Sequence, residues 1–131
     1  MSTIAKIFVA TGCSSGLGFE LVKQLLSQSQ PYKFILGARD PKNVSASFAA
    51  LKYDEKKHDL SILPLELADL KSVNKFAEQT LENLWKGKVD YLVLNAGLVK
   101  PAEETAEWKS KWSEQYLVNH LCEYIKSSIK F

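Results

Sequence analysis

The sequence predicts an α/β fold, in which a doubly wound parallel sheet of about four strands lies between layers of helices. Three observations support this prediction. Short apolar runs alternate with segments of helical periodicity, each early run is followed by such a segment, and the run DYLVLNAG (90–97) is apolar at consecutive positions, as a strand covered on both faces should be. This alternation favours a parallel sheet with right-handed crossovers and ligand binding at the carboxyl ends of the strands.

The first half of the chain supplies two strand–helix units. IAKIFVAT (4–11) predicts a strand, and GFELVKQLLSQ (18–28) predicts a helix because its apolar residues recur at helical spacing. KFILGA (33–38) predicts the second strand. Pro41 suits the first turn of a helix that we expect to reach about Tyr53.

The second half continues the pattern. SILPLEL (61–67) predicts a third strand, and Asp69 is expected to cap a helix that closes at Gly87. The fourth strand is residues 90–97, and a long helix is expected over residues 108–128. With no internal repeat or linker, residues 1–131 are expected to form one domain.

The composition of the chain excludes several classes of binding partner. A hydrophobic fraction of 46% with 24% charged residues is ordinary for a globular protein, and a net charge of +2 is too small to predict binding to nucleic acid or to an anionic membrane. No apolar run approaches the ~20 residues of a membrane span, and the N-terminus does not resemble a secretory signal. Cys13 and Cys122 fit neither a disulfide framework nor a zinc site. We therefore expect small-molecule or protein partners, no metal, and a reducing, cytoplasmic location.

The glycine-rich stretch FVATGCSSGLGFELV (8–22) joins the first strand to the first helix. In this context backbone N–H groups and the helix dipole converge on an anion. Gly12 can take the positive φ of a sharp turn, Gly16 lets the backbone approach a pyrophosphate, and Gly18 lets helix and strand pack closely. The plain alternative is a turn that only connects the two elements.

Two other motifs share these letters. Gly12 to Gly16 also fits the G-x-S-x-G turn of serine hydrolases, with Ser14 as nucleophile, but the turn follows the first strand, and His58 and His120 are the only histidines. A serine hydrolase therefore stays a remote alternative. A nucleoside triphosphate loop needs a lysine after the last glycine, where this chain has Phe19.

Three motifs together resemble the short-chain dehydrogenase/reductase family, which has a Rossmann-type fold. TGCSSGLG resembles the TGxxxGxG turn of that family, Asn95-Ala96-Gly97 resembles its NAG motif, and QYLVNHL resembles its catalytic-asparagine helix; the resemblance covers residues 3 to about 121. It implies an NAD(P)-binding domain whose strands have the order 3-2-1-4, with a catalytic role for Asn119 and a set of residues beside the cofactor. That set is Thr11, Gly12, Ser14, Ser15, Gly16, Leu17, Gly18, Arg39, Glu66, Leu67, Asn95, Ala96 and Gly97.

The resemblance also indicates which dinucleotide is preferred. NAD-dependent relatives carry an acidic residue at the end of the second strand, where this chain has Ala38 followed by Arg39. A guanidinium can bind a 2′-phosphate through charge-assisted hydrogen bonds, so NADP(H) is preferred and NAD(H) stays open. The plain alternative for Arg39 is a solvated charge paired with Asp40, and Ser15 stands where many NADP-binding relatives have a second basic residue.

Two further positions follow from the resemblance. Glu66 and Leu67 occupy the place where relatives present an aspartate and an apolar neighbour to the adenine, and Asn95 is expected to brace the central strands. A strand-terminating turn is the alternative explanation for Asn95 to Gly97.

The remaining catalytic groups of the family are absent from this chain. Relatives use a serine and a Tyr-x-x-x-Lys pair, in which the lysine lowers the pKa of the tyrosine acid. The one match, Tyr53 to Lys57, precedes the third strand and is therefore expected to be a false one. After VNHL the tail 122–131 departs from the family pattern, so we expect a truncated member whose fourth strand lies at a sheet edge and can pair with another chain.

The sequence thus predicts the NADP(H)-binding portion of an oxidoreductase acting on a carbonyl or alcohol substrate, catalytically incomplete as given. GARD, LADLKSV and VNHL resemble the retinol dehydrogenase and protochlorophyllide reductase branch most closely. The alternative is a non-catalytic dinucleotide-binding or dimer-interfering short product.

Overall fold

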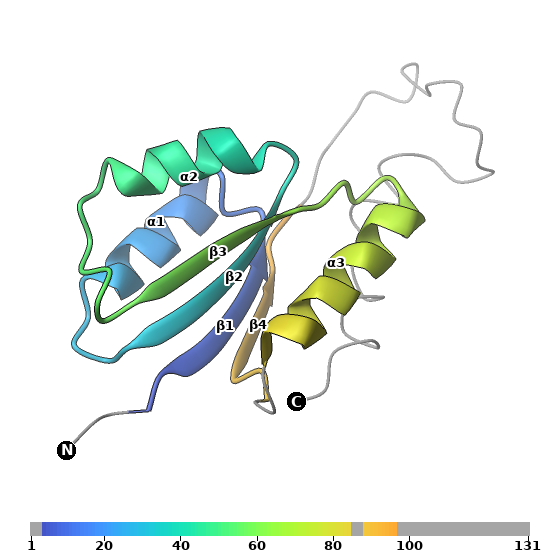
Figure 1. Ribbon diagram of the computed structural model, residues 1–131. Coiled ribbons are helices and arrows are strands. Elements are labelled where there is room, and N and C mark those ends of the chain that lie inside the picture. The colour runs from blue at the N-terminus through green and yellow to red at the C-terminus, as the bar shows by residue number, and fades with distance from the viewer. Residues whose placement is uncertain (1–3, 85–87, 97–131) are drawn as a thin grey trace.

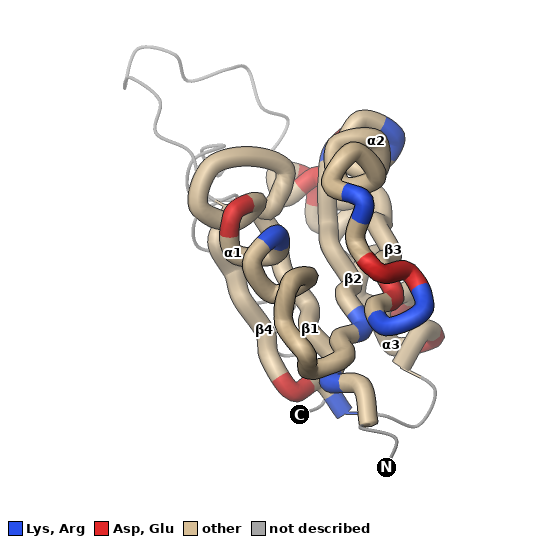
Figure 2. The backbone as a smooth tube through the Cα atoms, turned by 90° about the vertical axis from the view of Figure 1, so that its left-hand side faces the viewer, with Lys and Arg blue, Asp and Glu red and all other residues tan. Residues whose placement is uncertain are grey.

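The computed structural model describes residues 4–84 and 88–96, in which four parallel strands form one sheet in the order β3-β2-β1-β4. Helices α1 and α2 cover one face of this sheet and α3 covers the other (Figures 1 and 2). The predicted fold class and strand order are therefore confirmed. The elements are β1 (Lys6–Thr11), α1 (Gly16–Leu26), β2 (Tyr32–Ala38), α2 (Pro41–Ala49), β3 (Asp59–Pro64), α3 (Leu70–Leu84) and β4 (Tyr91–Leu94).

Each face of the sheet has its own apolar core, because inward residues alternate along the strands. On the α1 and α2 face, Phe8, Phe34 and Phe48 are almost fully buried. On the α3 face, Val9 and Phe76 are completely buried. Burial on both faces explains why β1 and β2 are continuous apolar runs.

The register brings the carboxyl ends of the strands to one edge. Thr11 of β1 lies beside Gly37 of β2 and Leu94 of β4, and Ala38 of β2 lies beside Pro64 of β3. The loops that follow these strands therefore meet at the same edge, where the sequence places its candidate site.

Three predicted boundaries were wrong, and the simplest is that of the fourth strand, which ends at Leu94 and not at residue 97. Helix α2 ends at Ala49 and not near Tyr53, because Lys52 adopts a left-handed conformation with φ of 51° that a continuing helix cannot contain. Strand β3 spans Asp59–Pro64, not 61–67: Leu65 donates a last backbone hydrogen bond to Ala38, after which the chain turns toward α3. The helix expected over 108–128 lies outside the described residues. No helix within the described ranges is long and apolar enough to cross a membrane.

Candidate functional site

Each of the three glycines after β1 is required for a different structural reason. Gly12 (φ 70°) and Gly16 (φ 62°) both adopt left-handed backbone conformations. A Cβ at Gly12 would lie 2.5 Å from the backbone nitrogen of Ala96, and one at Gly18 would overlap the carbonyl of Gly12, whereas a Cβ at Gly16 would meet nothing within 4 Å. Gly12 and Gly18 therefore permit close packing, and Gly16 borders open space at the start of the helix.

Two hydrogen bonds fasten this turn to the end of β4. The side-chain amide of Asn95 donates to the carbonyl of Gly12 at 3.1 Å, and the backbone N–H of Ala96 donates to the hydroxyl of Thr11 at 3.2 Å. Thr11 is 1% exposed, so its hydroxyl serves this contact and not solvent. The structure thus brings the TG and NA motifs together, 83 to 85 residues apart in the chain. Gly97 lies outside the described residues.

The N-terminus of α1 is electrostatically suited to an anion. Its N-cap, Ser15, makes no side-chain capping hydrogen bond, and its first turn contains no acidic residue. The first N–H groups of a helix have no partners within the helix, and they carry the positive end of its dipole. Ser14 and Ser15 are exposed, and Leu17 is 86% exposed. These exposed residues surround the open position at Gly16.

Cys13 fills the core beneath the turn, a role that its place in the motif does not reveal. Its side chain is 1% exposed, and its Sγ atom lies 3.7 Å from the carbonyl oxygen of Thr11. Burial raises the pKa of the thiol to about 11, so it stays protonated at neutral pH. Cys13 therefore acts as a small apolar packing residue and not as a nucleophile.

Arg39 is exposed directly after β2, at the same edge of the sheet. Asp40 accepts hydrogen bonds from the backbone N–H (3.3 Å) and side-chain amide (2.6 Å) of Asn43, and it thereby caps α2. Among the residues that the structure describes, no carboxylate lies within 4 Å of Arg39. The alternative pairing of Arg39 with Asp40 is therefore not formed.

The turn after β3 is ordered by its own side chains. The N–H of Glu66 donates to the hydroxyl of Ser72 at 2.8 Å, and the N–H of Ala68 donates to Oε1 of Glu66 at 3.1 Å. One carboxylate oxygen of Glu66 is thus already hydrogen-bonded within the turn. Leu67 is buried in the α3-side core, so only its backbone can face a ligand. Ser72 was not identified from the sequence as part of this turn. The available signal was the presence of a serine in the first turn of the following helix.

The residues of the rejected motifs lie elsewhere. Tyr53 and Lys57 belong to the loop before β3 and are not on a helix, and His58 precedes the same strand. The amino ends of parallel strands lie at the opposite edge from Ser14, so His58 cannot serve it as a base. Asn119 and His120 lie outside the described residues.

Comparison with known proteins identifies the family. The sequence model described as short chain dehydrogenase matches residues 6–123. The chain belongs to the short-chain dehydrogenase family. It is 58% identical over 123 residues to a short-chain dehydrogenase/reductase of Pestalotiopsis microspora, covering 94% of this chain and 42% of that protein. It is 27% identical over 124 residues to human retinol dehydrogenase 13, covering 95% of this chain and 36% of that protein.

A solved structure supports the same fold for this member of the family. The NADPH-bound carbonyl reductase from chicken fatty liver aligns with a TM-score of 0.75 and 26% identity, covering 98% of this chain and 48% of that one. The chain therefore spans less than half the length of each of these relatives.

Proposed function

We propose that this chain binds NADP(H) at the carboxyl edge of its sheet, as the cofactor-binding part of an oxidoreductase that acts on a carbonyl or alcohol. The observation that carries the proposal is the open position at Gly16, the first residue of α1. A diphosphate placed there would accept hydrogen bonds from the first N–H groups of the helix. The NADPH-bound carbonyl reductase, which shares this fold, lends support to the same ligand class.

The proposed contacts extend outward from the diphosphate. Ser14, Ser15 and Leu17 are exposed around the open position at Gly16 and would contact the cofactor there. Thr11, Gly12, Gly18 and Asn95 would hold the shape of the turn. Glu66 and the backbone of Leu67 would lie at the adenine, and Ala96 and Gly97 would lie nearer the nicotinamide, which supplies the hydride.

We propose NADP(H) over NAD(H) because of the end of β2. Ala38 carries no charge that would repel a 2′-phosphate, and Arg39 is exposed with no carboxylate within 4 Å among the described residues. A guanidinium on a phosphate forms charge-assisted, often bidentate hydrogen bonds. NAD(H) lacks that phosphate, so it would gain nothing from this contact.

Titration of the 131-residue chain with NADPH and with NADH tests both parts of the proposal. We expect NADPH to bind more tightly and Arg39→Ala to lower the NADPH:NADH affinity ratio about 10-fold, the lower end for hydrogen bonds to charged groups. Lys42→Ala, which removes an exposed cation from the first turn of α2, is the matched control and should leave the ratio unchanged. An unaltered ratio in Arg39→Ala would refute the role of Arg39, and no binding of either nucleotide would refute the site.

One observation favours a second function, that of a non-catalytic dinucleotide-binding module. The one Tyr-x-x-x-Lys match in this sequence, Tyr53 to Lys57, lies at the opposite edge of the sheet from the glycine turn. Asn119 alone cannot protonate an alkoxide. An assay of nicotinamide absorbance on this chain, beside a longer chain carrying the serine and tyrosine–lysine pair, separates the two functions: turnover by this chain alone excludes the second.

The proposal has two further parts: copies of this chain pair through β4, and the chain is located in a reducing compartment. Within the described sheet, β4 pairs only with β1, so its other edge has backbone groups available to a further strand. The buried, unpaired thiol of Cys13 suits the cytoplasm. Size-exclusion chromatography at several concentrations tests whether copies of this chain associate.

A further inference from the structure

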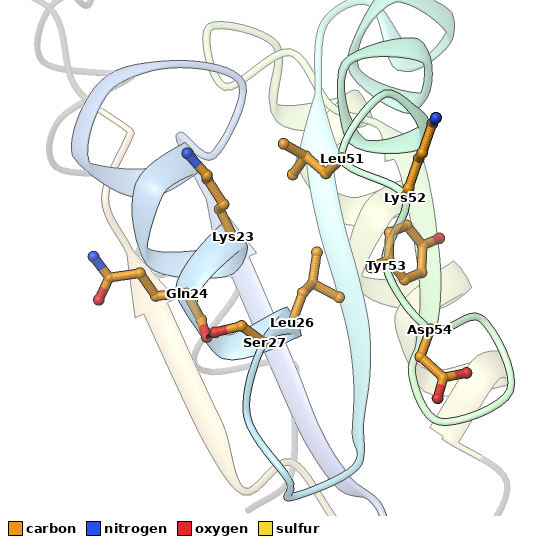
Figure 3. A pocket seen from close by; sticks show the side chains of 8 residues that line it. All are labelled: Lys23, Gln24, Leu26, Ser27, Leu51, Lys52, Tyr53 and Asp54. Carbon is orange, nitrogen blue, oxygen red and sulfur yellow. Dashed lines mark hydrogen bonds between the residues drawn. The ribbon is translucent and has the colours of Figure 1, made fainter.

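A pocket of about 420 Å³ lies at the edge of the sheet opposite the glycine turn, between the C-terminal end of α1 and the loop after α2 (Figure 3). Its volume falls within the range of small-molecule sites. The proposed cofactor contacts do not involve this part of the molecule, and the only family pattern that reaches it is the false Tyr-x-x-x-Lys match that begins at Tyr53. The pocket is lined by Lys23, Gln24, Leu26, Ser27, Leu51, Lys52, Tyr53 and Asp54.

Lys52, which lines this pocket, has an unfavourable backbone conformation. Its φ of 51° is the only positive φ of a non-glycine residue in the described ranges. It follows the last turn of α2, and its N–H donates to the carbonyl of Ala49. Glycine is the usual residue at such a position, because a side chain there costs free energy. A lysine at a position that favours glycine is a reason to look for a use of its side chain.

The pocket has a cationic rim over an apolar floor. Figure 3 shows the ammonium groups of Lys23 and Lys52 on opposite sides of the pocket, both at the end away from the carboxylate of Asp54. Lys23 makes only a 3.8 Å contact with Glu20, in which both side chains are half exposed. Among the described residues, no carboxylate lies within 4 Å of Lys52. The charged lining residues, Lys23, Lys52 and Asp54, therefore leave a net charge of +1, with both positive groups away from Asp54.

The remaining lining groups favour a ligand that has an apolar body and a hydrogen-bond acceptor. Leu26 is buried and Leu51 and Tyr53 are half buried, so their side chains form the floor. A tyrosine hydroxyl is already protonated at neutral pH, and burial, together with Glu55 and Asp59, raises the pKa of Tyr53 further, so its hydroxyl can donate a hydrogen bond. Asp54 already accepts a hydrogen bond from the N–H of Lys56 at 3.0 Å. Figure 2 shows both signs of charge along this loop.

We propose that this pocket is a second ligand site, which binds a small amphipathic carboxylate. Its apolar chain would lie on Leu26, Leu51 and Tyr53, and its carboxylate would lie at the rim formed by Lys23 and Lys52. The site is separate from the glycine turn, because the end of α1 and the loop after α2 lie at the amino edge of the sheet. Binding there does not require NADP(H).

Titration of the isotope-labelled 131-residue chain with octanoate, followed by NMR, tests the proposal. We expect saturable shifts at residues 23–27 and 51–54, and weaker binding of the neutral analogue octanamide. Lys23→Gln and Lys52→Gln should each weaken octanoate binding about two- to five-fold, as expected for exposed ion pairs. Lys42→Gln, on an exposed part of α2 outside the pocket, should change nothing. Equal affinities for octanoate and octanamide, or the absence of saturable shifts, would overturn the proposal.

The variant Lys52→Gly distinguishes a ligand-binding role of Lys52 from a structural role. Relief of the backbone strain should raise the Tm by about 2–6 °C, while the loss of the ammonium group should weaken octanoate binding as in Lys52→Gln. A Lys52→Gly variant that binds octanoate as tightly as the original chain would also refute the proposal. NADPH titration of Lys52→Gln should give an unchanged affinity, so the outcome at this pocket is independent of the outcome at the glycine turn.

Discussion

At the scale of single residues, Gly12 and Gly16 share a positive φ but differ in what surrounds them. A Cβ on Gly16 would meet no atom within 4 Å, whereas a Cβ on Gly12 would overlap the backbone of Ala96. The sequence predicted a positive φ for Gly12, which the structure has, but it did not predict the packing of Gly12 under Ala96. Only folding reveals that partner, because Ala96 is far from Gly12 in the sequence.

Gly16→Ala should fold with little loss of stability and lose dinucleotide binding. The added methyl meets no atom, so the cost is that of a left-handed alanine, about 1 kcal/mol. The same methyl would occupy the space proposed for the diphosphate. Urea unfolding and NADPH titration measure the two effects, with Gly12→Ala as the comparison: it should lose roughly 2 kcal/mol or more, because backbone atoms must move. A Gly16→Ala variant with unchanged NADPH affinity would contradict the proposed diphosphate position.

Thr11→Val tests the fastening of β4 to the glycine turn. Valine keeps the side-chain volume but cannot accept the hydrogen bond from the N–H of Ala96, so we expect a loss of about 1–3 kcal/mol. The Ala96 amide should also exchange its hydrogen faster. Thr11→Ser keeps the hydroxyl and loses a buried methyl, so it should be destabilised while the exchange rate of Ala96 stays near that of the original chain. Equal exchange rates in the two variants would show that this bond does not hold the turn.

At the scale of elements, the N-cap of α2 should be a measurable source of stability. Asp40→Ala removes the acceptor of both hydrogen bonds from Asn43, and we expect a loss of about 1 kcal/mol in urea unfolding. Asp40→Ser restores a capping oxygen and should recover most of that loss. If alanine and serine are equally stable at this position, the cap contributes nothing. NADPH affinity should be little changed in both variants, because Asp40 is committed to the helix and not to Arg39.

The elements also show how far the sequence could predict the structure. Periodicity, the proline at the start of α2 and the glycine turn indicated the existence and type of every described element, although not all of their ends. The end of α2 was missed because it depends on the left-handed conformation of Lys52, which no residue type signals. The limit of β3 was missed because Leu65 and Leu67 are apolar for another reason: they pack under α3. Residues buried in a turn are apolar, as are residues buried in a strand, so the sequence alone does not distinguish the two.

The candidate site was predictable to a similar degree. The motif residues indicated which loops meet, because the carboxyl ends of parallel strands share one edge. The local bonding partners were not predictable. The hydrogen bonds of Glu66 with Ala68 and Ser72, and of Asp40 with Asn43, depend on turn geometry that many sequences can satisfy in several ways.

At the scale of the whole molecule, the two edges of the sheet carry different chemistry. The carboxyl edge holds the glycine turn and Arg39, and the amino edge holds the lysine-rimmed pocket and the buried His58. His58 connects elements there: its Nδ1 accepts a hydrogen bond from the N–H of Tyr32 at 3.2 Å, and its ring stacks near the ring of Tyr32. With 2% exposure it belongs to the folded core, so its ionisation is linked to global stability.

His58 should make the fold less stable in mild acid. Burial, and then the charge of Lys57, lower the pKa of His58 below its ordinary value of 6.5, although Asp54 and the carbonyls of Leu26 and Gln28 oppose this. Below a pH of about 6.5 the unfolded chain therefore takes up a proton that the folded chain excludes. The free energy of unfolding should fall by up to about 1.4 kcal/mol per pH unit, until the pH reaches the folded-state pKa, below which this contribution stays constant.

The variant His58→Gln isolates this contribution, because glutamine keeps an acceptor for the N–H of Tyr32 and does not titrate. Urea unfolding of both chains between about pH 8 and pH 5, the latter about 1.5 units below the ordinary histidine value, should give curves that converge as the pH falls. His120 and the carboxylates are common to both chains, so their effects cancel in the difference. Parallel curves would mean that His58 is protonated equally in the folded and unfolded states, and that the hydrogen bond from Tyr32 does not fix it as the neutral imidazole.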